Sequence, residues 1–182
     1  GARVLRYGGR FSTYLLAPLV YGFRLRKNCD VIMDTHNAIP FFTPLFSRRP
    51  IVLLVHHISP AHQFAQEFSS PWMARVGLFL QNTLMPRLYK NRLLIAVSES
   101  TKTEMLKIGF NEKKIHIIYN GVDHTLFKPG SEKTVQPSIV YVGRLKKYKR
   151  LELLLDAFTK VKKKLPQATL TIAGSGDQEE SL

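Results

Sequence analysis

The residues best suited to bind a ligand lie in one strongly basic stretch, residues 143–150, with the sequence GRLKKYKR. Arg144 can hold a phosphate group through two parallel hydrogen bonds, and Lys149 adds a compact positive charge. Gly143 has no side chain, so a ligand can come close to its backbone. So many like charges in one turn repel one another unless an anion offsets them, which favours a phosphate-binding turn over a solvated basic turn.

A short glycine turn, Gly174-Ser175-Gly176, is a second candidate for binding an anionic ligand. Each of the two turns follows an apolar segment that predicts a β-strand, residues 138–143 and residues 168–174. Ligands of open α/β sheets usually bind at the carboxyl ends of the strands, so a nucleotide could lie across both turns. On its own, the Gly-x-Gly pattern is about equally typical of an ordinary tight turn.

Two adjacent histidines, His56 and His57, follow the apolar run of residues 51–55. Neighbouring residues of an extended chain point to opposite sides, so only one of the two can face a given cleft. A histidine there could hydrogen-bond a substrate hydroxyl, although the spacing alone favours a packed histidine. His62 and Glu67 lie nearby, but their spacing matches no standard zinc motif, so no metal site is predicted.

Polar side chains also end the first apolar run, in the order Asp34-Thr35-His36-Asn37. Such a cluster at the end of a strand could line a cleft, and Asn37 and His57 are the candidate cleft residues. Asp and Asn are also common at the start of a helix, where their side chains accept hydrogen bonds from free backbone N–H groups. The residue types slightly favour the helix start.

Short apolar runs rich in β-branched residues, which are typical of strands, must position these side chains. Longer segments with helical signals separate several of the runs, and this alternation predicts an α/β fold with parallel sheets covered by helices. The first four runs are residues 30–34 (DVIMD), 51–55 (IVLLV), 93–97 (LLIAV) and 115–119 (IHIIY).

Two helices can be placed from their sequence signals. Residues 101–108 follow a strand almost directly, and Thr101 and Glu104 have the spacing of a capping box. Residues 151–165 are amphipathic, and Pro166 fixes the end of that helix. Its predicted apolar face consists of Leu151, Leu154, Leu155, Phe158, Val161 and Leu165, with Leu153 as an exception on the polar face.

A change in composition divides the chain. Residues 123–137, which contain Pro129, Gly130 and Pro137, predict a linker between residues 1–122 and residues 138–182. The second part stops just after its second strand, which is too little to close a doubly wound sheet. The chain is therefore expected to be a fragment.

The composition narrows the class of protein. With 182 residues and 45% hydrophobic composition, the chain can bury a substantial core. The longest apolar stretch near the start, residues 14–23, is too short to span a bilayer. The net charge of +14 attracts anions such as nucleotides, acidic lipid headgroups or nucleic acid, although most Lys and Arg residues are expected on solvated faces. Cys29 is the only cysteine, which excludes an intrachain disulfide and fits a reducing cytosol.

Six stretches form a wider pattern, VIMDTHN, IVLLVHHISP, LIAVSESTKTEML, KIHIIYNGVDHTLFKP, IVYVGRLKKYKRLELLLDAF and LTIAGSGDQEE. Taken together, they resemble the group-1 (family 4) glycosyltransferases, whose GT-B fold has two Rossmann-like domains. The resemblance implies retaining transfer of a sugar from a nucleoside diphosphate donor to a hydroxyl acceptor, without an obligatory metal or other cofactor. It makes residues 1–122 part of the acceptor-side domain and residues 138–182 the start of the nucleotide-sugar-binding domain.

The resemblance also implies roles for single residues. Gly143, Arg144 and Lys149 match the stretch whose Arg and Lys hold the donor diphosphate in the family. The glycine turn of residues 174–176 looks like the loop that faces the nucleotide. His56 looks like the histidine near the transferred sugar, which makes it the catalytic candidate.

The chain departs from the family in three places. His57 stands where an acidic residue is common. The family's opening strand with its glycine-rich acceptor loop is not recognisable, and the later acidic motif E-x(7)-E, which contacts the donor sugar, is absent. Residues 1–182 alone are therefore expected to be inactive.

Other interpretations stay open. A sugar-nucleotide epimerase or a phosphorylase can have the same fold, and a sequence that covers the acidic motif would discriminate. A nucleic-acid-binding module could use the +14 charge, but no standard reader motif is present, so no specific nucleic-acid partner is expected. Basic patches also suit an anionic membrane surface and a lipid-linked acceptor. The expected location is the cytoplasm, with peripheral attachment to the inner face of the membrane as a further option.

Overall fold

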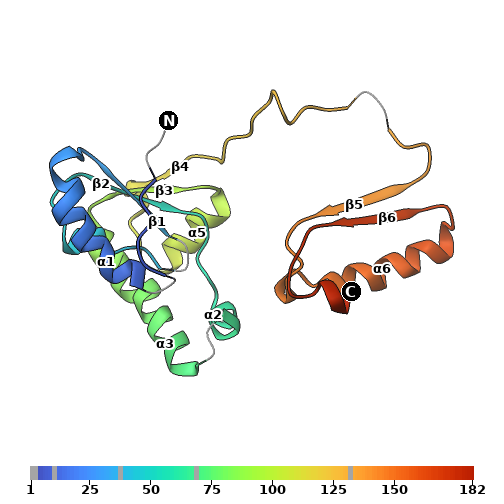
Figure 1. The fold of residues 1–182 in the computed structure, drawn as a ribbon, viewed down its shortest axis with the longest axis horizontal. Helices are drawn as coiled ribbons and strands as arrows, with labels where there is room; N and C mark the ends of the chain where they lie inside the picture. The colour runs from blue at the N-terminus through green and yellow to red at the C-terminus, as the bar shows by residue number, and fades with distance from the viewer. Residues whose placement is uncertain (1–3, 10–11, 37–38, 68–69, 131–132) are drawn as a thin grey trace. The chain divides into compact units, whose positions relative to one another are not determined.

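Two parallel β-sheets, one in each unit of the chain, form the framework of the computed structural model (Figure 1). Unit 1 comprises Gly1–Val122 and unit 2 comprises Asp123–Leu182. The structure describes residues 4–9, 12–36, 39–67, 70–130 and 133–182. The predicted α/β class with parallel sheets is confirmed.

Four parallel strands form the sheet of unit 1, in the order β1-β2-β3-β4. All four predicted runs form strands, and pairing sets where each strand ends. β1 pairs with β2 from Ile32 opposite Ile51 to His36 opposite Val55, which moves β1 toward His36 relative to the predicted run. The strands are β1 (Ile32–His36), β2 (Ile51–Val55), β3 (Leu93–Ala96) and β4 (Ile115–Ile117).

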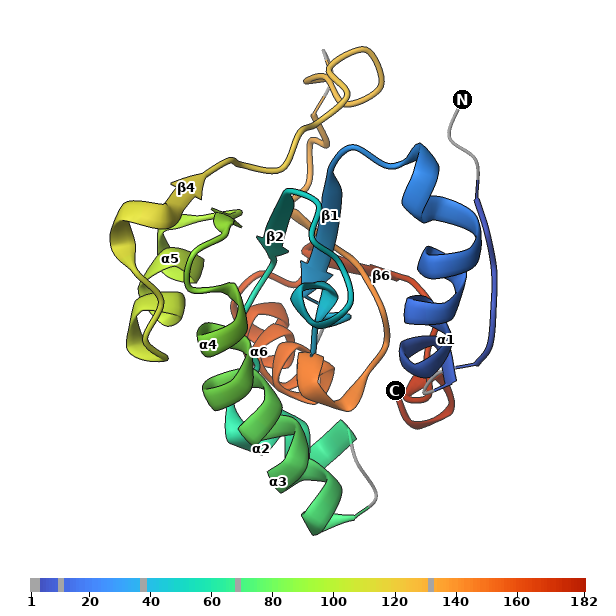
Figure 2. The same ribbon diagram turned by 90° about the vertical axis from the view of Figure 1, so that its left-hand side faces the viewer.

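One helix precedes β1, and further helices lie in the connections from β2 to β3 and from β3 to β4 (Figure 2). The connection from β2 to β3 contains α2 and then a continuous helical segment made of α3, the π-helical turn η4 and α4. The bounds are α1 (Ser12–Val20), α2 (Ala61–Glu67), α3 (Pro71–Phe79), η4 (Leu80–Leu84), α4 (Met85–Tyr89) and α5 (Glu99–Lys107). A π-helical turn, η1 (Tyr21–Leu25), follows α1, and the 3-10 turns are η2 (Arg26–Asn28), η3 (Thr43–Leu45) and η5 (Glu112–Lys114).

The core of unit 1 lies on one face of this sheet. Residues paired in register share a face, so Leu53 of β2 and its partner Leu94 of β3 point to the same side, and both are fully buried. Met85 and Tyr89 of α4 and Met105 of α5 belong to the same buried cluster. Burial of each such side chain contributes about 1.5 to 3 kcal/mol, which holds the strands and helices in place.

A buried carboxylate fixes the segment that follows β1. Asp34, which is 2% exposed, accepts hydrogen bonds from the backbone N–H groups of Phe41 at 3.0 Å and Thr43 at 3.2 Å. The hydroxyls of Thr43 and Tyr89 donate to it as well. The predicted helix start is wrong, because Asp34 and His36 lie inside β1 and are buried. Asn37 lies outside the described residues.

Tyr89 should make the free energy of unfolding depend on alkaline pH. Burial, followed by the charge of Asp34, raises the pKa of Tyr89 above its ordinary value of 10.0. Above that pH the unfolded chain loses the phenol proton and the folded chain keeps it, so unfolding becomes easier by about 1.4 kcal/mol per pH unit. We expect the stability difference between the protein and Tyr89→Phe to fall from about pH 10 upward in urea titrations. Parallel curves for the two proteins would contradict this expectation.

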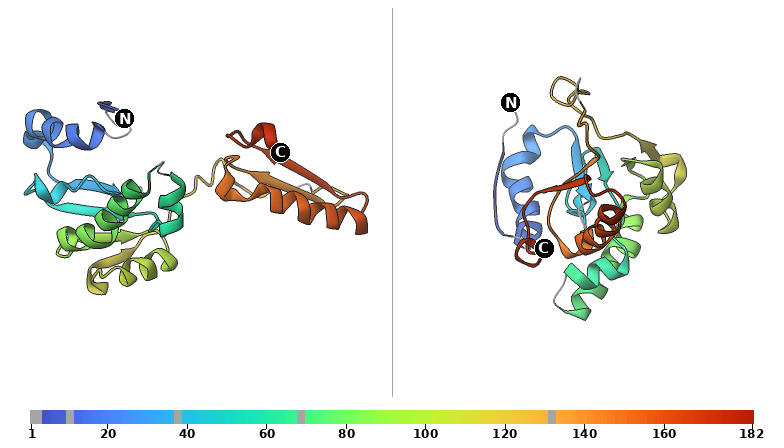
Figure 3. Two further views of the ribbon diagram at one scale, coloured as in Figure 1. Left: turned by 90° about the horizontal axis from the view of Figure 1, so that it is seen from below. Right: turned by 90° about the vertical axis from the view of Figure 1, so that its right-hand side faces the viewer.

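The framework of unit 2 is two parallel strands and the helix that connects them, and the 3-10 turn η6 (Lys147–Lys149) precedes that helix. Helix α6 (Leu151–Lys164) runs along one face of the sheet formed by β5 (Ser138–Val142) and β6 (Thr169–Ala173) (Figure 3). The predicted apolar face is confirmed in part, since its first five members are buried or half-buried whereas Leu165 is 42% exposed. The helix ends before Pro166, as predicted. A 3-10 turn, η7 (Glu179–Ser181), lies near the end of the chain.

Candidate functional site

The two predicted ligand-binding turns lie at the carboxyl ends of β5 and β6, and backbone hydrogen bonds join them. The N–H of Gly143 donates to the carbonyl of Ala173 at 3.0 Å, which continues the strand pairing. The N–H of Leu145 donates to the carbonyl of Ser175 at 2.9 Å, and the N–H of Gln178 donates back to Leu145 at 3.1 Å. The basic turn and the glycine turn therefore form one structural element.

Gly174 and Gly176 allow this close approach. A Cβ atom on Gly174 would lie 1.8 Å from the carbonyl oxygen of Gly143. A Cβ atom on Gly176 would lie 2.1 Å from the carbonyl oxygen of Leu145. Both distances are far shorter than any van der Waals contact, so only glycine fits at either position. The Gly-x-Gly pattern is thus required by the packing of the two turns against each other.

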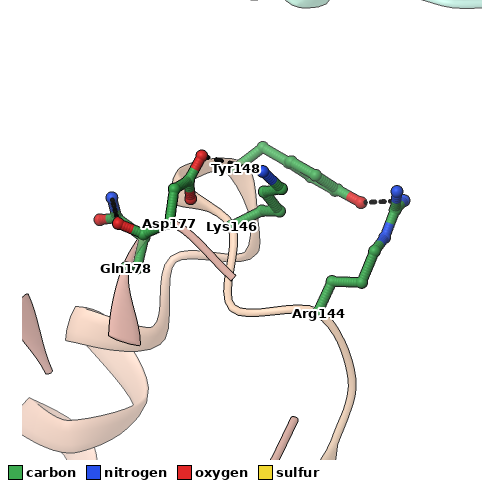
Figure 4. Close-up of polar contacts among 5 residues, drawn as sticks. All are labelled: Arg144, Lys146, Tyr148, Asp177 and Gln178. Carbon is green, nitrogen blue, oxygen red and sulfur yellow. Dashed lines mark hydrogen bonds and ion pairs between the residues drawn. The ribbon is translucent and has the colours of Figure 1, made fainter. Parts of the chain in front are cut away.

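Tyr148 contacts both Arg144 and Lys149, the two cations predicted to bind a phosphate. Arg144 donates a hydrogen bond from Nη2 to the hydroxyl of Tyr148 at 2.8 Å (Figure 4). The amino group of Lys149 lies 5.1 Å from the centroid of the same ring, and the guanidinium carbon of Arg144 lies 5.9 Å from it. The Tyr148 side chain is itself exposed. Two positive charges are therefore held around one ring at the surface.

Two other cations of the turn, Lys146 and Arg150, have acidic partners. Lys146 forms an ion pair with Asp177 at 3.0 Å, which links the basic turn to the residue after the glycine turn (Figure 4). Arg150 pairs with Glu152 in the first turn of α6. Within the described part of the chain, Arg144, Lys147 and Lys149 form no such pair with a carboxylate. Of these three, Arg144 and Lys149 are the two that contact Tyr148, and both remain able to meet an incoming anion.

The start of α6 offers few free backbone N–H groups to an anion. Arg150, in the left-handed conformation with φ of 53°, accepts a hydrogen bond from the N–H of Leu153 at 3.0 Å. The backbone N–H of Glu152 is the main cause that lowers the pKa of the Glu152 carboxyl, and Arg150 lowers it further. One N–H group of the first turn is therefore engaged by a backbone carbonyl, and a second lies close to the Glu152 carboxylate. The side chains before the helix, more than its N-terminus, give the turn its capacity for anions.

The two predicted histidines lie in unit 1, directly after β2. The side chains of His56 and His57 are both exposed, so the alternative of packed histidines does not apply. Nε2 of His57 lies 3.3 Å from the hydroxyl of Ser59. Across the described residues, no group of three or more His, Cys, Asp or Glu side chains is arranged to hold a metal ion.

The predicted capping box at the start of α5 is wrong. The N-cap is Ser98, whose hydroxyl accepts the N–H of Thr101 at 3.1 Å, so the helix begins at Glu99. Thr101 and Glu104 point instead toward the segment after β2. The hydroxyl of Thr101 donates to the carbonyl of His56 at 3.0 Å, and Glu104 accepts the N–H of Ile58 at 3.1 Å. A capping spacing and a tertiary contact use the same residue types, and here the tertiary contact prevails.

Sequence reasoning misses Gln81 altogether. This side chain is fully buried and hydrogen-bonds to both backbone groups of Ser59, each at 2.9 Å. The available signal is a pair of adjacent amides, Gln81 and Asn82, within the largely apolar helical segment of residues 78–85. A polar residue among apolar ones on a helix needs a buried partner, but its identity depends on the tertiary fold.

None of the helices in the described part of the chain combines the length and the apolar character needed to cross a membrane.

Family models match the chain from residue 2 to its last residue. Residues 2–126 match the model described as Glycosyltransferase Family 4, and residues 122–182 match the model described as Glycosyl transferases group 1. Two similar proteins from Methanocaldococcus jannaschii are named uncharacterized glycosyltransferases. MJ1069 is 25% identical over 150 residues, which are 78% of this chain and 37% of that protein. MJ1607 is 34% identical over 109 residues, which are 52% of this chain and 27% of that protein.

Solved structures of Anabaena Alr3699/HepE share the fold. The complex of that protein with UDP-glucose has a TM-score of 0.61 at 22% identity, over 88% of this chain and 43% of that one. The complex with UDP has a TM-score of 0.66 at 23% identity, over 93% of this chain and 47% of that one. The likeness confirms an α/β fold of the GT-B type. The chain spans somewhat under half the length of these structures and about a third of the curated relatives.

Proposed function

This chain belongs to Glycosyltransferase Family 4, and on that premise we propose that its enzyme transfers a hexosyl group from a nucleoside diphosphate sugar to a hydroxyl acceptor with retention of configuration. The acceptor class comprises glycans, lipid-linked sugars and small molecules. The observation that carries the proposal is the joined pair of turns in unit 2, in which Arg144 and Lys149 flank Tyr148 beside the glycine turn.

The proposed work of this element is to hold the donor diphosphate. When the bond between the sugar and the diphosphate breaks, negative charge develops on the departing phosphate. Arg144 can meet it with two parallel hydrogen bonds and Lys149 with a point charge, so protein cations supply the stabilisation that a metal ion supplies elsewhere. The glycine turn, Gly174-Ser175-Gly176, presents backbone without bulky side chains to the nucleotide.

We assign the sugar end of the reaction to His56. It is exposed at the carboxyl end of β2, where an imidazole can hydrogen-bond a hydroxyl of the transferred sugar. His57 and Asn37 are the proposed residues on the acceptor side. The family membership of unit 1 supports these roles.

UDP-glucose is the first donor to test, because HepE is described in complex with UDP-glucose and with UDP. We expect UDP to bind residues 1–182 with a dissociation constant on the order of 0.1 to 1 mM and UMP to bind more weakly, because it lacks one phosphate. In amide NMR spectra UDP should shift the signals of Gly143, Leu145 and Ser175 and leave those of β3 unchanged.

Two outcomes would contradict the proposal. Equal chemical-shift changes with UDP and with UMP would show that these turns do not recognise the diphosphate. Salt-steep binding of DNA of any sequence, without any response to nucleotides, would favour a nucleic-acid-binding module. We further propose that residues 1–182 alone do not catalyse sugar transfer. Detectable transfer by this chain would refute that part of the proposal.

A further inference from the structure

Three side chains hold the backbone of the segment after β2, residues 56–59. They are Gln81 from the π-helical turn η4 and Thr101 and Glu104 from α5. Between them they bond the carbonyl of His56, the N–H of Ile58 and both backbone groups of Ser59. We call these three side chains the clamp.

Gln81 makes the most extensive contact of the clamp. Its Oε1 accepts the N–H of Ser59 and its Nε2 donates to the carbonyl of Ser59, both at 2.9 Å. The same Nε2 donates to the side chain of Asn82 at 2.9 Å. Gln81 is fully buried and Ser59 is 4% exposed, so water does not compete for these bonds. Single π-helical turns inside α-helices occur often at functional sites, and this one carries Gln81.

Thr101 and Glu104 complete the clamp from one face of α5. Thr101 is 3% exposed, and its hydroxyl donates to His56 at 3.0 Å. Glu104 is half-buried and accepts the N–H of Ile58 at 3.1 Å. A carboxylate that accepts from a backbone N–H makes a charge-assisted bond, which is about twice as strong as a neutral one. The two residues lie one helical turn apart, so both reach the same segment.

The arrangement fixes a backbone and leaves its imidazole exposed. Apolar side chains could fill the space of Gln81 and Thr101 without the desolvation cost of buried polar groups. The advantage of polar side chains here is geometric. Directional hydrogen bonds to the backbone of His56, Ile58 and Ser59 fix the backbone position from which the His56 side chain extends. We infer that Gln81, Thr101 and Glu104 are positioning residues for His56, holding it so that its imidazole meets the transferred sugar in one orientation. This inference rests on the proposed function of His56.

The local effect can be measured on residues 1–182 by amide hydrogen exchange. Glu104→Ala removes the acceptor of the Ile58 N–H, so we expect exchange at Ile58 to accelerate at least about tenfold, the change for a lost bond of ordinary strength. Thr103→Ala is the matched control, because the one hydrogen bond of the Thr103 hydroxyl among the described residues goes to the carbonyl of Glu99 within the same helix. Unchanged exchange at Ile58 in Glu104→Ala would overturn the clamp.

The catalytic effect is measured in the enzyme expressed from its complete open reading frame, with UDP-glucose as the donor. Loss of orientation should lower kcat about 10- to 100-fold in Glu104→Ala and in Gln81→Ala, with the KM for the donor changed by less than about twofold. Glu104→Gln keeps an acceptor oxygen and should restore most of kcat. A fall in activity that follows loss of folded protein, without rescue by Glu104→Gln, would show a merely structural role and overturn the inference.

His56→Ala separates failure of this inference from failure of the proposed function. If His56→Ala leaves turnover unchanged, the assigned role of His56 is wrong, and the clamp has nothing to position. If His56→Ala lowers kcat but Glu104→Ala and Gln81→Ala do not, the role of His56 stands and the clamp is refuted. Thr101→Ala with Thr101→Ser as its conservative partner gives an independent pair, because serine keeps the hydroxyl that bonds His56.

Discussion

Arg144→Ala is expected to lower kcat of the complete enzyme about 10²- to 10³-fold, or about 2.7 to 4 kcal/mol of transition-state stabilisation, by analogy with the loss of one donor to a developing oxyanion. Arg144 is well prepared for this role. Its hydrogen bond to Tyr148 holds the guanidinium in place, and no carboxylate in the described part of the chain neutralises it. The variant leaves Lys149 alone to meet a charge that two cations are placed to share.

The measurement compares steady-state kinetics of the enzyme with those of two variants. Lys163→Ala is the matched control, because it removes one exposed positive charge from the last turn of α6. It should change kcat by less than about twofold, since long-range screening weakens its effect at physiological salt. Arg144→Lys keeps the charge but not the paired hydrogen bonds, and we expect an intermediate value. Unchanged turnover in Arg144→Ala would refute the proposed role.

Gly174→Ala and Gly176→Ala are each expected to destabilise unit 2 by about 3 to 5 kcal/mol, which exceeds the usual cost of overpacking. The reason is steric, because the added Cβ atoms would lie 1.8 Å from the carbonyl oxygen of Gly143 and 2.1 Å from that of Leu145. Both oxygens are backbone atoms, so the turns must separate and lose the hydrogen bonds that join them. Loss of UDP binding should follow.

Amide exchange resolves this effect, because it reports on β5 and β6 separately from β2 and β3. Protection should disappear from β5 and β6 in the glycine variants and persist in unit 1. Gly121→Ala is the control, because no atom lies within 4 Å of the Cβ it would introduce. Equal protection in Gly176→Ala and Gly121→Ala would mean that the close approach of the two turns is not what holds unit 2 together.

The sequence predicts the framework well where the signal is local. Runs such as residues 51–55 are apolar and β-branched, and the observed β2 has the predicted bounds. The helix before Pro166 ends as predicted, because proline cannot continue it. The pairing of the two turns is also observed, because strands that are neighbours in a parallel sheet end at the same edge.

The predictions fail where a polar side chain could form an equally good hydrogen bond with either of two partners. Glu104 could bond the start of its own helix or a distant N–H, and only the fold brings Ile58 within reach. Asp34 could cap a helix, yet β1 extends past it. Its buried carboxylate instead accepts hydrogen bonds from the hydroxyls of Thr43 and Tyr89. Gln81 gives no signal beyond its polarity. The roles proposed for Arg144 and Lys149 depend on a ligand and stay predictions.

The joined turns separate the residues that maintain the fold from those that face solvent. Gly174 and Gly176 allow the close approach of the two turns, and neither position has room for a side chain. Among the described residues, the side chains of Arg144 and Lys149 contact the exposed ring of Tyr148. Their side chains can therefore be exchanged without disturbing strand pairing. We therefore expect that charge and shape at the three outward positions, 144, 148 and 149, can be varied in engineered variants while the strand pairing beneath them is kept.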